Sequence, residues 1–290
     1  MPTKTASPMT VSGDLANSEK LCRKIANSHY ENFLVSRLLL PRRYRQPFVN
    51  VYAFCRTADD LADESDSPES ALKQLAQFQT SLDATFAGHP PGGLFPALHQ
   101  TVEDFHLDQQ PFNDLLCAFR QDQLETRFRD FEELLCYCQR SANPVGRIVL
   151  RLADAASDEN VAFSDKICTG LQLVNFWQDV ARDFAIGRVY LPNDQMERFG
   201  VDDAMLRLPT TVAPLRQLLV SECNRAEQYF LDGQTIISRV PKWLGRNLSL
   251  FIGGGLATIS AIRKIDFDVL KQRPTVSKRT QIRLVLKHFW

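Results

Sequence analysis

Two short acidic segments hold the residues whose types and spacing could do chemistry. Residues 56–64 read Arg-Thr-Ala-Asp-Asp-Leu-Ala-Asp-Glu, and residues 172–183 read Gln-Leu-Val-Asn-Phe-Trp-Gln-Asp-Val-Ala-Arg-Asp. In each segment two aspartates stand four residues apart, a spacing that puts both carboxylates on one face of an α-helix. Carboxylates so placed repel each other, and more strongly when partly buried, unless a cation lies between them. The two segments therefore predict cation-binding sites.

Magnesium is the cation that suits such ligands, because Mg²⁺ keeps several waters and bridges one or two carboxylates to substrate phosphates. We predict two facing helices that hold Mg²⁺ and a diphosphate at one end of an apolar cavity. The alternative is a pair of solvated helix ends, which the shared four-residue spacing disfavours. The predicted metal ligands are Asp59, Asp60, Asp63, Asn175, Asp179 and Asp183.

Helical periodicity accounts for most of the chain from about residue 17. The predicted helices span 46–64, 68–86, 94–105, 111–127, 130–152, 164–184, 211–238 and 243–265, with Ser164 as an N-cap and a kink at Asn143-Pro144. No regular strand-turn-strand spacing occurs, so an all-α fold is expected. We expect residues 1–17, which are polar and aperiodic, to form a disordered tail, and 18–290 to form one domain.

Composition narrows the class of protein. The 34 basic and 34 acidic residues give no net charge, which argues against a general nucleic-acid binder. No run of 18 apolar residues is present, and the N-terminus lacks the pattern of a secretory signal. The odd number of cysteines, seven, suits free thiols in a reducing compartment, so a cytoplasmic location is expected.

The two segments resemble motifs of the squalene/phytoene synthase family. The matching residues are Tyr52-Ala-Phe-Cys-Arg56 running into Asp59-Asp60-x-x-Asp63, Gln172-Leu-Val-Asn175-x-x-x-Asp179-x-x-x-Asp183, and Gly187-Arg188-Val-Tyr190-Leu-Pro192. The resemblance implies a single-domain, isoprenoid-synthase-type helical bundle around a central apolar cavity, a prenyl diphosphate substrate and Mg²⁺.

A finer resemblance points to the hydroxysqualene synthase branch of bacterial hopanoid biosynthesis. It rests on Glu31-Asn-Phe33, Phe119-Arg-Gln-Asp122, Ser141-Ala-Asn-Pro-Val-Gly-Arg147 and Asn175-Phe-Trp-Gln-Asp-Val180. This branch implies conversion of presqualene diphosphate and water to hydroxysqualene and diphosphate, with no need for NADPH.

The resemblance also implies roles for single residues. The residues implied in catalysis are Asp59, Asp63, Asp179, Asp183, Tyr52 and Arg56, and those implied in substrate binding are Phe33, Gln172, Asn175, Arg188, Tyr190, Tyr137 and Asn143. Arg56, Arg188, Tyr52 and Tyr190 would contact phosphate oxygens. Aromatic faces stabilise a carbocation by cation–π attraction, for which Phe33, Phe54, Tyr137 and Phe176 are candidates. Asn143 and Gln172 are candidates for holding the reacting water.

Two departures from the family pattern argue against full condensation of two prenyl diphosphates. Head-to-head condensing members usually carry Arg immediately before the first Asp of the second motif and Glu before its last Asp, where this chain has Gln178 and Arg182. The alternatives are a transferase that condenses two prenyl diphosphates to squalene or phytoene, and a non-catalytic helical partner protein.

The C-terminal residues 263–290 are strongly basic, with eight Lys or Arg against two Asp. Interspersed apolar residues predict a basic amphipathic helix. Such a helix either packs on the core as a terminal helix or contacts anionic lipid at the inner face of a membrane, and both interpretations remain open here.

Overall fold

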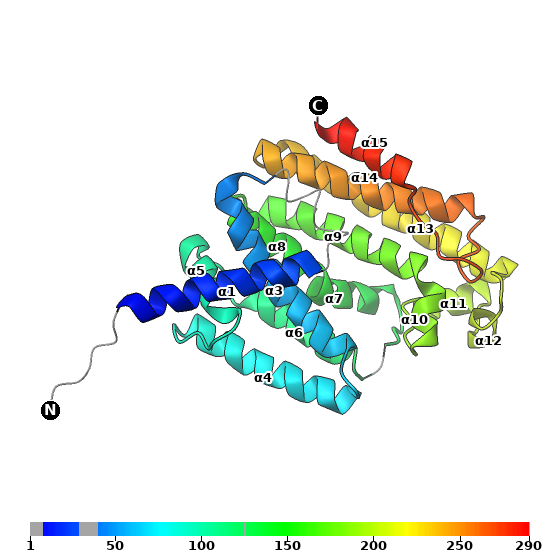
Figure 1. The fold of residues 1–290 in the computed structure, drawn as a ribbon. Coiled ribbons are helices and arrows are strands. Elements are labelled where there is room, and N and C mark those ends of the chain that lie inside the picture. Colours follow the sequence, from blue (N-terminus) through cyan, green and yellow to red (C-terminus); the bar gives the residue numbers. More distant parts are fainter. Residues whose placement is uncertain (1–7, 29–39, 125, 290) are drawn as a thin grey trace. The chain divides into compact units, whose positions relative to one another are not determined.

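The computed structural model describes residues 8–28, 40–124 and 126–289 (Figure 1). Every regular element in these ranges is a helix, so the predicted all-α fold is confirmed. None of the helices in the described ranges is both long enough and apolar enough to cross a bilayer. The chain divides into two compact units, Met1–Gln123 and Leu124–Trp290.

The first unit contains the helix that carries the first acidic segment. Its helices are α1 (Pro8–Ser28), α3 (Arg42–Asp63), α4 (Pro68–Phe86), α5 (Phe95–Phe105) and α6 (Gln110–Gln121). Helix α3 packs against all four others, with Ala53, Phe54 and Ala58 fully buried. The acidic residues lie at its C-terminal end, so packing along the rest of α3 fixes their position.

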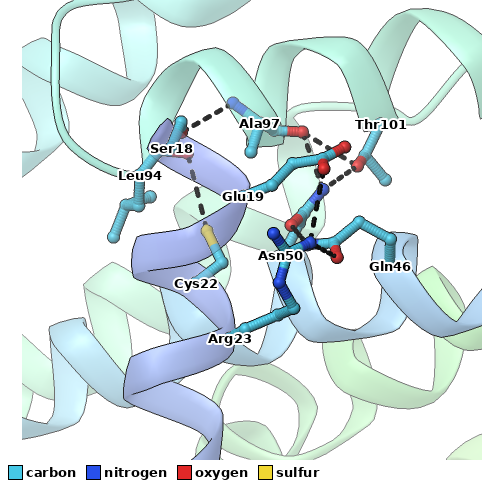
Figure 2. Close-up of polar contacts among 9 residues, drawn as sticks. All are labelled: Ser18, Glu19, Cys22, Arg23, Gln46, Asn50, Leu94, Ala97 and Thr101. Carbon is cyan, nitrogen blue, oxygen red and sulfur yellow. Dashed lines mark hydrogen bonds and ion pairs between the residues drawn. The ribbon is translucent and has the colours of Figure 1, made fainter. Parts of the chain in front are cut away.

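A buried polar network joins α1 to α3 and α5 (Figure 2). Asn50 on α3 donates to the carbonyl of Ala97 and to the hydroxyl of Thr101, both at 3.0 Å. Ser18 on α1 accepts a hydrogen bond from the Ala97 N–H, also at 3.0 Å. Because buried polar groups are costly unless paired, these bonds specify how the three helices meet.

The second unit contains the helix that carries the second acidic segment. Its helices are α7 (Phe131–Ser141), α8 (Asn143–Leu152), α9 (Asp158–Gln178), α10 (Val180–Ala185), α11 (Asn193–Phe199), α12 (Asp203–Leu206), α13 (Ala213–Gly233), the 3₁₀ helix η1 (Gln234–Ser238), α14 (Lys242–Lys264) and α15 (Lys278–Phe289). Helix α9 packs along α13 and also contacts α7, α8 and α14. Figure 1 shows α15 lying along α14.

Two glycines let α9 and α14 approach the ring of Phe230 on α13. A Cβ at Gly170 would lie 3.0 Å from that ring, and a Cβ at Gly255 would lie 2.3 Å from it. The Phe230 ring is fully buried between them. Close helix packing is thus the role of Gly255, whereas a Cβ at Gly254 would meet nothing within 4 Å.

Two local predictions differ from the structure, and a third agrees with it. Helix α1 begins at Pro8, so residues 8–17, predicted as disordered, are helical here, and residues 1–7 lie outside the described ranges. Helix α9 begins earlier than residue 164, because Ser157 accepts the capping bond from the Asn160 N–H and Ser164 is buried inside the helix. The break at Asn143 is confirmed, since α7 ends at Ser141 and α8 begins at Asn143.

Candidate functional site

The first acidic segment is organised by one arginine. Within the last turns of α3, Arg56 donates a hydrogen bond to Asp59 at 2.8 Å and forms an ion pair with Asp60 at 2.5 Å, and Glu64 lies 3.8 Å away. The guanidinium thus supplies the positive charge that three clustered carboxylates require. Asp63 is the last residue of α3 and is exposed.

Tyr52 belongs to the same stripe of α3. Burial raises the pKa of its phenol, and the positive charge of Arg56 opposes that rise while Asp59 and Asp60 add to it. These interactions place Tyr52 within electrostatic reach of the acidic cluster. Tyr52, Arg56, Asp59 and Asp60 are all partly accessible to solvent, as residues that meet a substrate must be.

The second acidic segment lies on a kink rather than on the single continuous helix predicted over 164–184. Helix α9 ends at Gln178 and α10 begins at Val180, with Asp179 between them at φ −109° and ψ 16°. The backbone bonds from Asp179 N to Asn175 O and from Asp183 N to Asp179 O are nevertheless kept. Asp179 thus occupies the sparsely populated bridge region, where many active-site residues are found.

The predicted polar stripe survives this kink. Gln172, Asn175, Asp179 and Asp183 are all partly or fully accessible. The apolar positions between them, Leu173, Val174, Phe176, Trp177 and Val180, are buried. This arrangement keeps the polar side chains at the surface of an otherwise apolar helix.

The electrostatics of Asp183 show that this surface favours a cation. Burial, followed by the negative charge of Asp179, raises the pKa of the Asp183 carboxyl to about 7. Arg188, Arg182 and Arg273 act in the opposite direction but do not restore its ordinary pKa. A carboxylate pair that resists double ionisation gains from any further positive charge.

Arg273 is a site residue that the sequence analysis missed. Its Nε and Nη2 atoms lie 2.5 and 2.9 Å from the two carboxylate oxygens of Asp179. Nη2 also bonds to Oε1 of Gln178 at 3.2 Å, and Nε2 of Gln178 donates to the carbonyl of Pro274 at 2.6 Å. Gln178 stands where an Arg is usual in condensing members of the resembled family, so here it tethers a guanidinium that comes from elsewhere in the chain.

No sequence signal identifies Arg273, because 94 residues separate it from Asp179. In the sequence, Arg273 is one of the eight basic residues within 263–290. A nearby cation would stabilise the carboxylate of Asp179, but the sequence does not indicate which basic residue supplies it.

Three residues predicted to line the substrate site lie together in an aromatic cluster. The rings of Phe176 and Tyr190 stack at 3.8 Å with an interplanar angle of 10°. Tyr137 lies 6.2 Å from Phe176 and 5.8 Å from Tyr190. Tyr137 and Tyr190 also contact Phe128.

A cavity of about 10 Å³ adjoins this cluster. Phe176, Tyr190, Asp183 and Arg188 line it together with Trp177. The indole N–H of Trp177 is buried and has no hydrogen-bond partner among the described residues. The volume is about that needed for one water molecule, and polar side chains, among them Asp183 and Arg188, border it.

Other predicted residues have different surroundings. Asn143 is buried and accepts a hydrogen bond from the hydroxyl of Thr169 at 3.0 Å, which ties α8 to α9. Phe54 is fully buried in the first unit against Phe78 and Phe112, so its ring fills the core there. Phe33 lies outside the described residues.

The residues of the two segments suit Mg²⁺, although neither segment forms a complete cage. Across the described ranges, no three His, Cys, Asp or Glu side chains gather closely enough to hold a metal ion by themselves. Mg²⁺ does not require such a cage, because one or two carboxylates together with waters and substrate phosphates suffice. The oxygen donors and the raised pKa of Asp183 therefore fit a magnesium–diphosphate ligand.

Comparison with known proteins identifies related sequences. A model of the family described as squalene/phytoene synthase matches residues 26–280. The phytoene synthase of Arthrospira platensis is 29% identical over 280 residues, which cover 90% of this chain and 89% of that protein. The 15-cis-phytoene synthase of Synechocystis is 29% identical over 293 residues, which cover 95% and 84%.

Solved structures of similar proteins also include synthases of this kind. The squalene synthase HpnC of Alicyclobacillus acidocaldarius is 37% identical with a TM-score of 0.84, covering 90% of this chain and 97% of that one. A dehydrosqualene synthase in complex with ligand is 25% identical with a TM-score of 0.87, covering 96% and 98%. These proteins are enzymes, which speaks against the alternative of a non-catalytic helical partner.

Proposed function

Because the chain belongs to the squalene/phytoene synthase family, we propose that this enzyme converts presqualene diphosphate and water to hydroxysqualene and diphosphate. The reaction would serve isoprenoid synthesis of the hopanoid type. Both acidic segments would hold the diphosphate of one substrate, and the aromatic side chains would surround its hydrocarbon part.

One observation carries the choice of an alcohol product: the cavity of about 10 Å³ beside Asp183 and the stacked Phe176–Tyr190 pair. Formation of an alcohol requires a water molecule that is held next to the carbocation, so that this water attacks the carbocation. Trp177, whose indole N–H is buried without a partner among the described residues, and Asp183 both line this cavity, so they would offer such a water a donor and an acceptor. Aromatic faces beside it would stabilise the positive charge before capture.

The proposed reaction balances without a reductant. The carbon–oxygen bond to diphosphate breaks, and its electron pair leaves with the diphosphate. The rearranged C₃₀ cation then accepts a lone pair from water, and the water proton passes to the departing diphosphate or to solvent. NADPH is therefore not expected in this reaction.

The chain's own residues would bind and orient the leaving group. Asp59, Asp60, Asp63, Asn175, Asp179 and Asp183 would hold Mg²⁺, which when bound neutralises charge on the diphosphate. Arg56 and Arg188, with Tyr52 and Tyr190, would donate hydrogen bonds to its oxygens. Preorganised donors of this kind stabilise charge that develops during bond breaking.

The test is an incubation of purified protein with Mg²⁺ and presqualene diphosphate, without NADPH, in H₂¹⁸O. Mass spectrometry should find hydroxysqualene carrying one ¹⁸O atom. Asp59→Asn and Asp179→Asn should each abolish turnover while leaving the far-UV circular dichroism spectrum unchanged. A hydrocarbon as the only product would contradict the proposal. So would turnover by a variant that carries both Asp59→Asn and Asp179→Asn.

Head-to-head condensation of two prenyl diphosphates is the second candidate. It is favoured by the names of the related proteins and by Arg273, which puts a guanidinium beside Asp179 although Gln178 replaces the usual Arg. Farnesyl or geranylgeranyl diphosphate supplied alone should then give a C₃₀ or C₄₀ product. The same mass spectrometric analysis separates the two reactions.

We further propose that the protein works in the cytoplasm, with a peripheral contact between its basic C-terminus and the inner face of a membrane. The support is the charge of residues 263–290, eight Lys or Arg against two Asp. The oily product proposed above would leave most readily into lipid.

A further inference from the structure

The last two helices of the chain contain no acidic residue. Residues 242–290, which include α14 and α15, carry ten Lys or Arg and two Asp, both in the loop between the helices. Since the whole chain has 34 of each charge, the preceding 241 residues carry 24 basic and 32 acidic side chains. Positive charge is thus concentrated at the C-terminal end of a neutral protein.

Helix α15 directs two apolar side chains away from the protein. Ile282 is 60% exposed and Leu286 is 56% exposed. They stand four residues apart and therefore lie next to each other on one face of the helix. Leu284 and Val285 are partly buried. A helix that only closed the core would bury Ile282 and Leu286 as well.

Basic side chains surround this apolar pair. Lys278, Arg279 and Arg283 are exposed. At ~100° per residue they fall on the same half of the helix as Ile282 and Leu286. The outer face of α15 thus has an apolar centre and a cationic rim.

We propose that this outer face, formed by Lys278, Arg279, Ile282, Arg283 and Leu286, docks on an anionic lipid surface. Helices that lie in the interface of a membrane combine apolar side chains with Lys and Arg in this way. Anionic headgroups attract the cations, and the two apolar side chains enter the acyl boundary. Helix α14 supports α15 from the side facing the protein (Figure 1).

The charge pattern favours lipid over a macromolecular partner. Two apolar side chains are too few for the buried centre of a stable protein interface. A nucleic acid would leave Ile282 and Leu286 in contact with phosphates rather than with apolar groups. A bilayer satisfies both kinds of side chain at once.

The inference gives the proposed membrane contact a defined surface. Of the proposed reaction it uses only that the product is oily. Docking is measured without Mg²⁺ or substrate, so the two ideas can fail separately. A protein that binds vesicles but forms no product would overturn the reaction alone, and one that turns over substrate but binds no vesicle would overturn the docking surface alone.

The experiment is co-sedimentation of the full chain with vesicles of phosphatidylcholine containing about one third phosphatidylglycerol. We expect Ile282→Asp/Leu286→Asp to weaken the partition coefficient about tenfold or more, because both apolar contacts are lost. Arg279→Gln/Arg283→Gln should weaken binding to the anionic vesicles by about thirtyfold. It should also reduce the sensitivity of that binding to salt.

The control is Leu231→Asp, which changes a 48% exposed leucine on α13 and should leave binding unchanged. Circular dichroism of each variant shows whether its fold is retained, and the charge variant tests the surface even if the aspartate variant unfolds. Equal sedimentation of the native chain with pure phosphatidylcholine would overturn the proposal. So would equal binding by the native chain and both double variants.

Discussion

At the scale of single residues, the acidic segments are held by arginines. Arg56 neutralises Asp59 and Asp60 from one turn away, and Arg273 does the same for Asp179 from a distant loop. Exposed ion pairs contribute little to folding stability, whereas a cation beside clustered carboxylates removes a specific repulsion. The arginines therefore prepare surfaces that a divalent cation and a diphosphate can share.

The role of Arg273 can be tested by substitution. Arg273→Gln removes the guanidinium beside Asp179, and we expect the free energy of unfolding to fall by about 1 kcal/mol. Mg²⁺ should restore part of that loss, because it supplies positive charge to the same carboxylates. Urea unfolding with and without Mg²⁺ measures both effects.

Arg127→Gln is the matched control. It breaks another two-bond arginine pair, with Asp203 at 3.1 and 2.6 Å. Mg²⁺ should not restore its stability. Equal restoration of both variants, or of neither, would contradict the assignment of Arg273 to the acidic segment.

Glu222 is a buried carboxyl outside the candidate site. Burial raises its pKa to about 7, with Arg225 and Arg198 lowering it and Asp194 raising it. Its carboxylate lies 3.5 Å from the Arg225 guanidinium, and neither oxygen has a hydrogen-bond partner in the described part of the chain. Since the unfolded chain releases this proton near pH 4.5, the folded state binds more protons between about pH 4.5 and 7.

Stability should therefore fall as the pH rises through that window, by up to about 3 kcal/mol from this group. Glu222→Gln should match the native protein near pH 4 and exceed it at pH 8 in urea unfolding. Glu227→Gln on the same helix is the control, because Glu227 is partly exposed and paired with Arg263. A gain at pH 8 that is equal in both variants would contradict this account.

At the scale of helices, close approach decides where the second acidic segment lies. The ring of Phe230 on α13 fits between Gly170 on α9 and Gly255 on α14, so three helices share one contact. Helix α9 carries Asn175 near its end and leads into Asp179. Packing far from the acidic residues therefore fixes the axis along which they are presented.

Alanine substitutions at two neighbouring glycines test this packing. Gly255→Ala should destabilise the protein by about 1–3 kcal/mol, because the new Cβ meets a buried ring that Gly170 confines on its other side. Gly254→Ala should stabilise it by about 0.5–1 kcal/mol, since its Cβ would enter open space and alanine favours a helix interior. Thermal unfolding measures both, and opposite signs are the expected result. Equal effects would contradict the packing argument.

At the scale of the whole molecule, the two acidic segments belong to two compact units, one within Met1–Gln123 and the other within Leu124–Trp290. A ligand held by both segments would link the stability of the two units. Binding to the folded state alone stabilises by about 2.7 kcal/mol at a ligand concentration of 100 Kd. Stability in the presence of ligand therefore reports whether both segments serve one site.

Inorganic diphosphate with Mg²⁺ should raise the unfolding temperature of the native chain. Asp59→Asn in the first unit and Asp179→Asn in the second should each remove most of that rise. A full rise in either single variant would show that one segment alone holds the ligand. Mg²⁺ without diphosphate serves as the baseline for all three proteins.

The sequence determined the fold class, most helices and the identity of both acidic segments. These features depend on interactions between residues close in sequence: helical periodicity, caps, and carboxylates repeated every four residues. The segments were recognisable because acidic and amide side chains interrupt apolar stretches. The resemblance to a family then supplied the roles of Tyr137, Phe176 and Tyr190, whose rings the structure brings together.

Only the tertiary structure decided which distant residues complete these segments. Arg273 reaches Asp179 across 94 residues, and the kink at Asp179 is not visible in a helical pattern that continues through it. The outward face of Ile282 and Leu286 was likewise undecided, because an amphipathic pattern does not say which side the rest of the protein covers. Such features depend on packing between elements, and local sequence periodicity carries no record of it.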